Sequence, residues 1–127
     1  MLAGLWALFI AACSSTVIGP RAFVGGASHA VGVSRAGFQS FWDRTWWIFV
    51  KGFHALEFAI LALLLWRAGA RPLVAFALAV GWAALDEWHQ TFVPARGGRV
   101  TDVLIDVGGA AAMLLVVALL RRRTQRG

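Results

Sequence analysis

Four mainly apolar stretches follow one another along the chain, separated by short polar segments. They occupy residues 2–19, 52–66, 72–88 and 103–120. A transmembrane helix needs roughly 20 apolar residues, so each stretch is long enough, or nearly so, to cross a bilayer. The pattern predicts an all-α polytopic membrane bundle of four transmembrane helices, which forms a single domain over residues 1–127.

The first stretch is interrupted only by Ser14, Ser15 and Thr16, whose hydroxyl groups we expect to bond back to carbonyls of their own helix. A secretory signal peptide needs a basic region at its start, and residues 1–12 carry no charged side chain. Residues 10–13 also resemble the lipidation site of bacterial lipoproteins, but the same basic region is missing. An uncleaved helix is therefore the preferred interpretation.

The segment between the first two stretches differs in character. Glycine is frequent in residues 25–37, with polar residues between, which is typical of a loop. From residue 38 to residue 49, aromatic side chains recur at helical spacing, which predicts an interfacial aromatic helix in the headgroup layer. The alternative is that residues 46–50 simply begin the second span early.

Composition supports a membrane location. Of the 127 residues, 60% are hydrophobic and 14% are charged, and a soluble domain of this length could not bury so much apolar surface. The mean hydropathy is +0.73. The single cysteine, Cys13, excludes an internal disulfide.

The net charge of +6 comes from cations that mostly flank the apolar stretches, with four arginines in the last seven residues. This distribution is typical of membrane anchoring and not of a nucleic-acid-binding face. We therefore expect a protein integral to the bacterial cytoplasmic membrane, with membrane lipids as partners and no nucleic acid. The dense C-terminal arginines predict that both termini are cytoplasmic.

The rare polar side chains concentrate near the ends of three predicted spans. Residues 51, 54 and 57 repeat at three-residue spacing, so they share one side of a helix, and residues 102 and 106 are four apart. The topology brings these helix ends and the loop before residue 102 to one membrane face, which the orientation above places outside. The predicted polar cluster, a candidate binding site, contains Lys51, His54, Glu57, Asp86, Glu87, Gln90, Arg96, Asp102 and Asp106.

Charged groups at membrane depth are costly and are functional candidates by default, although ion pairs that only tie helix ends together remain an alternative. His54 and Glu57 share a helical face that could also begin a metal site, but Lys51 and Arg96 favour internal ion pairing, so we expect no metal and no cofactor. Gly97 and Gly98, flanked by arginines, suit either a phosphate group or a tight turn. No nucleophile with an adjacent base is evident, so no catalytic residue is assigned.

At these residues the chain resembles the VanZ-like family of small bacterial membrane proteins, over about residues 47–116. Two motifs in the right order carry the resemblance. The first is Lys51-x-x-His54-x-x-Glu57, and the second is Asp86-Glu87-x-x-Gln90-x-Phe92-x-Pro94-x-Arg96 followed by Asp102-x-x-x-Asp106-x-x-Gly109. The chain departs from the family pattern at Asp106, where asparagine is frequent, and at Ala95, where glycine is frequent.

The family's namesake is associated with resistance to glycopeptide antibiotics such as teicoplanin, which act on cell-wall precursors at the outer membrane face. The resemblance implies the fold and the membrane location more than an activity. The clustering of charges beside the aromatic stretch leads us to expect a non-enzymatic envelope protein whose polar cluster binds a lipid or cell-wall-precursor headgroup or a lipidated glycopeptide. The alternative is a membrane-embedded hydrolase or transferase acting on a lipid-linked phosphate, with His54 or Glu87 as general base and Arg96 as charge stabiliser. A transporter would need more than four spans or an oligomer, and the sequence does not predict the oligomeric state.

Overall fold

The computed structural model is all-α. It describes residues 1–16, 20–94 and 97–125, without the side chains of residues 20–22. Within these ranges it contains five helices, which are α1 (Leu2–Ser15), α2 (Pro20–Ala30), α3 (Arg35–Arg67), α4 (Pro72–Gln90) and α5 (Val100–Thr124).

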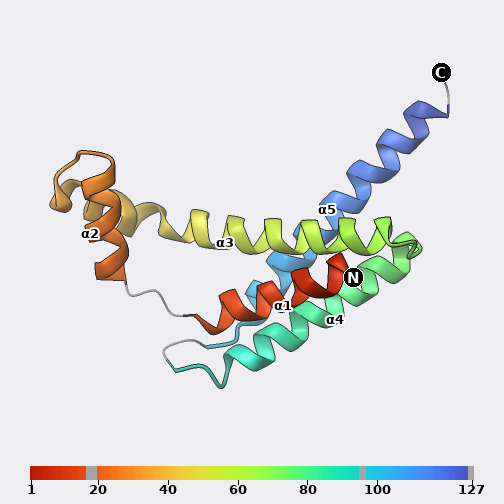
Figure 1. Ribbon diagram of the computed structural model, residues 1–127, viewed down its shortest axis with the longest axis horizontal. Helices are drawn as coiled ribbons and strands as arrows, with labels where there is room; N and C mark the ends of the chain where they lie inside the picture. Colours follow the sequence, from red (N-terminus) through yellow and green to blue (C-terminus); the bar gives the residue numbers. More distant parts are fainter. Residues whose placement is uncertain (17–19, 95–96, 126–127) are drawn as a thin grey trace.

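Four of the helices, α1, α3, α4 and α5, pack together, whereas α2 lies beside the first turns of α3, away from this bundle (Figure 1). α4 runs antiparallel to α3, and α5 runs antiparallel to α4 (Figure 1). The N-terminus, the α3–α4 turn and the C-terminus therefore lie toward one end of the molecule, and the α4–α5 loop and α2 lie toward the other (Figure 1).

The tightest contact between helices is the crossing of α3 and α5. At this crossing the backbone of Gly109 passes against the backbone carbonyl of Ala55, so that a Cβ atom at position 109 would overlap that carbonyl. Further along, three alanines of α3, α4 and α5 form a buried cluster, which consists of Ala62, Ala79 and Ala110. Small residues of this kind let helix backbones approach closely where lipid provides no hydrophobic driving force.

A second buried cluster joins α1 to the same three-helix core. Ile10 of α1 is fully buried with Phe58 and Leu61 of α3 and Ala83 of α4. Residue 10 lies four positions before Ser14, so the two residues share one face of α1. This face is the one that α1 presents to the bundle.

The prediction of a loop over residues 25–37 was wrong for most of this range, because residues 20–30 form α2 and α3 begins at Arg35. The packing of α2 against α3 outweighs the low helix propensity of Gly25 and Gly26. Val24 is fully buried, and the ring of Phe23 lies 4.4 Å from that of Trp42 between ring centroids. The loop is confined to the few residues before α3, where Gly32 adopts a φ of 67°.

The aromatic segment and the second predicted span belong to one continuous helix. α3 has 33 residues, which corresponds to about 50 Å at 1.5 Å per residue. Ser34 caps its start, since the Ser34 hydroxyl accepts a hydrogen bond from the Gly37 N–H at 3.2 Å. The aromatic residues thus form the N-terminal part of the helix that continues into the bundle.

Two helices, α3 and α5, are long and apolar enough to cross a membrane among the residues that the structure describes. Only 28% and 11% of their most apolar windows are buried within the protein, unlike the core helix of a soluble protein. The whole chain exposes 8675 Å², whereas a soluble monomer of its mass would expose roughly 6,600 Å². α3 and α5 are therefore candidate membrane spans.

The α3–α5 crossing leads to a first prediction. Gly109→Ala should lower the free energy of unfolding by about 1–3 kcal/mol, because the added methyl group overlaps the Ala55 carbonyl and the helices must separate. The matched control is Gly108→Ala, since nothing lies within 4 Å of a Cβ at that position. Thermal unfolding in detergent would compare the two, and equal stability of both variants would contradict the crossing.

Candidate functional site

Six polar side chains from four helices are buried together with the bundle core. Each side chain is at most 7% exposed. Four of the six are carboxylates, and charged groups are rarely buried without partners. They lie where α1 and α4 end, where α5 begins and at the middle of α3. The set, called the polar cluster below, consists of Ser14, Glu57, Asp86, Glu87, Gln90 and Asp106.

Ser14 links α1 to the cluster. Its hydroxyl donates a hydrogen bond of 2.6 Å to Asp86 Oδ2, which also accepts one of 2.9 Å from Gln90 Nε2. The prediction that the Ser14 hydroxyl bonds back to its own helix was therefore wrong, whereas it was correct for Ser15 and Thr16. The sequence did contain one indication that Ser14 faces the bundle, because Ser14 lies on the same face of α1 as the apolar Ile10.

Two further contacts tie the middle of α3 to α5 and α1. Lys51 Nζ lies 2.6 Å from Asp102 Oδ1, and each side chain is 32% exposed. Trp6 of α1 donates its indole N–H to the Glu57 carbonyl oxygen at 2.8 Å. On α3 itself, His54 Nδ1 lies 3.5 Å from Glu57 Oε2, as the three-residue spacing predicted.

The segment before α5 folds back onto the end of α4. The Arg99 backbone N–H donates a 2.7 Å hydrogen bond to Glu87 Oε2, and a Cβ atom on Gly98 would overlap the Glu87 carbonyl. Since the Arg99 N–H already donates to Glu87, it is not available to a phosphate group. The geometry therefore favours a tight turn at Gly97 and Gly98 over a phosphate site. Arg96, which with Lys51 was one of the two cations predicted in the cluster, lies outside the described residues.

The polar cluster is strongly acidic. Asp86 Oδ1 and Asp106 Oδ1 are buried without a hydrogen-bond partner among the described atoms. Asp106 also lies within electrostatic reach of the carboxylates of Glu57, Asp86, Glu87 and Asp102. Buried carboxylates require a proton or a cation as compensation, so this end of the bundle is suited to groups that donate hydrogen bonds or carry positive charge.

None of these acidic groups forms a recognisable metal centre. Within residues 1–16, 20–94 and 97–125, no three His, Cys, Asp or Glu side chains are arranged to hold a metal ion.

A groove of about 1020 Å³ opens between α1, α2 and the part of α3 that runs from Trp42 to Glu57, where the groove reaches the polar cluster. Six aromatic rings dominate its walls. The aromatic stretch was evident in the sequence, but the groove was not, because it also needs Phe23 of α2 and one face of α1. The lining residues are Phe9, Ala12, Cys13, Thr16, Phe23, Trp42, Asp43, Trp46, Phe49, Val50, Phe53, His54 and Glu57.

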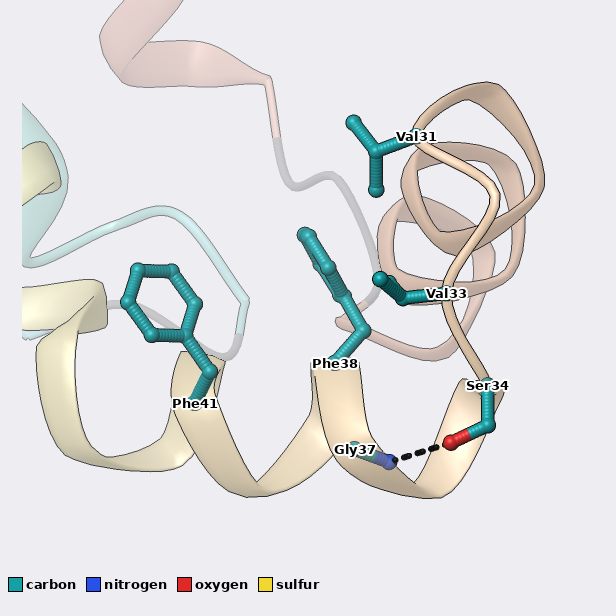
Figure 2. A pocket seen from close by; sticks show the side chains of 6 residues that line it. All are labelled: Val31, Val33, Ser34, Gly37, Phe38 and Phe41. Carbon is teal, nitrogen blue, oxygen red and sulfur yellow. Dashed lines mark hydrogen bonds between the residues drawn. The ribbon is translucent and has the colours of Figure 1, made fainter.

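A smaller hollow of about 520 Å³ lies where the loop after α2 enters α3 (Figure 2). Its lining side chains are apolar apart from Ser34, and the Ser34 hydroxyl points to the Gly37 N–H that it caps (Figure 2). Because this hydroxyl already has a partner, the hollow offers little to orient a ligand. The larger groove is therefore the better candidate site.

An all-α bundle with two long apolar helices that are little buried, together with a buried polar end, agrees with the class of small integral membrane proteins. The chain belongs to the VanZ/LLP1 family, whose model matches residues 4–121. This match confirms the resemblance found in the sequence and extends it to the first helix. The comparisons with curated proteins and with solved structures found no match.

The hydrogen bond between α1 and α4 leads to a second prediction. Ser14→Ala should reduce the free energy of unfolding by about 1–3 kcal/mol, because the buried Asp86 carboxylate loses a donor that water cannot replace. Ser15→Ala is the matched control, since the Ser15 hydroxyl bonds only to the Ala11 carbonyl and is exposed. Unfolding in detergent would be followed by circular dichroism, and an equal loss for both variants would contradict the role of Ser14.

Proposed function

We propose that the protein is a non-enzymatic envelope protein that binds an amphiphile. The ligand class comprises lipids, cell-wall precursors and lipidated glycopeptides. The apolar chain of the ligand lies in the aromatic groove, and its headgroup lies against the polar cluster. The observation that carries the proposal is the continuity of the groove, which runs from Trp42 beside α2 to His54 and Glu57 at the cluster.

The size and lining of the groove support this proposal. Ligand sites commonly measure about 300–1,000 Å³, with mostly apolar walls and a few polar groups that orient the ligand. The groove matches that description, with aromatic rings along its length and polar side chains near its ends. Each CH₂ group of a chain that leaves water for such walls contributes about 0.8 kcal/mol.

The membrane arrangement is part of the same proposal. Four crossings, by α1, α3, α4 and α5, place both termini and the α3–α4 turn in the cytoplasm and the polar cluster at the outer face. The arginines of α5 and of the turn support this orientation, since cytoplasmic segments are enriched in cations. Arg121 also lies 4.6 Å from the ring centroid of Trp66, which joins the cytoplasmic ends of α5 and α3.

Cysteine labelling tests the orientation. In a Cys13→Ser background, Val100→Cys should react with a membrane-impermeant maleimide on intact cells, because residue 100 is the first residue of α5, at its outer end, and is exposed. Ala68→Cys, in the turn after α3, should react only after the cells are permeabilised. Labelling of Ala68→Cys on intact cells would contradict the proposed topology.

Matched tryptophan variants test the groove. Trp46 and Trp47 are adjacent and similarly exposed, at 45% and 51%, but only Trp46 lines the groove. Dodecan-1-ol with a photoreactive diazirine in its chain would be added to protein in phosphatidylcholine nanodiscs, and labelled peptides would be mapped by mass spectrometry. We expect saturable labelling of α1 and α3 peptides, which Trp46→Ala weakens several-fold and Trp47→Ala does not.

Competition with unlabelled dodecan-1-ol separates a site from the surrounding lipid. The groove would be refuted as a binding site if excess unlabelled dodecan-1-ol did not reduce the labelling. Equal labelling of the Trp46→Ala and Trp47→Ala variants would refute it as well.

A further inference from the structure

The end of the molecule that carries the α3–α4 turn and the C-terminal turns of α5 has positive side chains and no acidic ones. No aspartate or glutamate occurs in residues 58–85 or 107–127. The arginines of the described chain in these two ranges are exposed and come from three helix ends on one side of the bundle (Figure 1). This set, called the arginine end below, consists of Arg67, Arg71, Arg121, Arg122 and Arg123.

Helix dipoles account for most of these cations but not for Arg71. Arg67 and the arginines of α5 lie in the last turns of their helices, where the carbonyl ends favour positive charge. Arg71 is instead the N-cap of α4, which makes no side-chain cap hydrogen bond and has no acidic residue in its first turn. A cation is disfavoured beside the positive end of a helix, where serine or aspartate is preferred. An anion from outside the chain would therefore be stabilising at Arg71.

The guanidinium group of Arg121 is held toward the same turn. It lies 4.6 Å from the ring centroid of Trp66, which directly precedes Arg67 in the last turn of α3. A short turn with Gly69 at a φ of 100° then reverses the chain before Arg71. Arginines of α3, α4 and α5 thus gather around one turn. Guanidinium groups present paired N–H donors that match the oxygens of a phosphate group.

The surroundings of these arginines favour a lipid phosphate over a soluble one. The apolar stretch of α5, residues 103–120, measures about 27 Å, close to the roughly 30 Å of a hydrocarbon core, so Arg121 follows at headgroup level. Leu120, directly before Arg121, is 57% exposed, and Leu73, two positions after Arg71, is 77% exposed. Each of these arginines therefore lies next to an apolar side chain that an acyl chain can cover.

We propose that the arginine end binds the phosphate group of an anionic phospholipid, with Arg71 and Arg121 as its main contacts. Phosphatidylglycerol has the required net negative charge. Phosphatidylcholine carries the same phosphate together with a quaternary ammonium group, which arginines repel. This site is separate from the aromatic groove, whose residues on α3 run from Trp42 to Glu57.

Photoreactive lipids test the site. Phosphatidylglycerol and phosphatidylcholine, each with a diazirine in the acyl chain near the glycerol, would be titrated against the full chain in phosphatidylcholine nanodiscs. Phosphatidylglycerol should label peptides of the α3–α4 turn and of the last turns of α5 at concentrations about fivefold lower, the ratio that corresponds to one arginine near an anionic headgroup. Unlabelled phosphatidylglycerol should displace this labelling, and inorganic phosphate should not.

Matched arginine variants locate the source of the preference. Arg71→Gln and Arg121→Gln should each reduce the preference for phosphatidylglycerol several-fold. Arg44→Gln is the control, because Arg44 is an exposed arginine near the opposite end of α3 and its replacement removes the same charge. This variant should leave the preference unchanged.

Thermal unfolding separates lipid binding from a purely structural role of Arg71. Because a ligand stabilises the folded state that binds it, the melting temperature of the unmodified protein should rise when phosphatidylglycerol replaces part of the phosphatidylcholine. Arg71→Gln should not lower the melting temperature in pure phosphatidylcholine, since a cation at this N-cap is not stabilising. The same variant should lose most of the rise with phosphatidylglycerol.

Three results would overturn the proposal. The first is equal labelling of the arginine end by both lipids, or a preference that Arg44→Gln weakens as much as Arg71→Gln and Arg121→Gln do. The second is displacement of the labelling by inorganic phosphate, because a soluble anion would then be the ligand. The third is an Arg71→Gln variant that lowers the melting temperature equally with and without phosphatidylglycerol, as a structural arginine would.

Discussion

The close approach of α3 and α5 is the contact on which the rest of the structure depends. Because Gly109 has no side chain, the α5 backbone reaches the Ala55 carbonyl of α3. One turn before Ala55, Lys51 then meets Asp102, and Asp106 is brought to the interior between these two contacts. A wider crossing would separate these side chains and leave charged groups facing lipid, which is costly.

The polar cluster and the aromatic groove share α3, and this helix explains how the site is assembled. Its second half packs in the bundle and buries Glu57, while its first half projects beyond the bundle with α2 (Figure 1). The face that carries Glu57 therefore continues outward as the aromatic wall of the groove. This arrangement joins the apolar groove to the acidic end of the bundle.

Local patterns predicted most of the bundle, because helix periodicity and Pro72 mark where its helices run. The gathering of Glu57, Asp86 and Asp106 also followed from topology, since it needs only that helix ends meet at one face. The sequence could not reveal contacts that depend on how helices rotate against one another. The partner of Ser14 and the groove are of this kind, and α2 was missed because its packing on α3 outweighs its glycines.

A charge exchange between the middle of α3 and the first turn of α5 tests most directly whether the two helices meet as described. Lys51→Asp and Asp102→Lys each place two like charges 51 positions apart in sequence but side by side in the fold. The account predicts that either variant alone lowers the melting temperature in nanodiscs and that the double variant, which restores an ion pair, recovers most of the loss. A double variant as unstable as the sum of the two single changes would contradict the crossing and the polar cluster built on it.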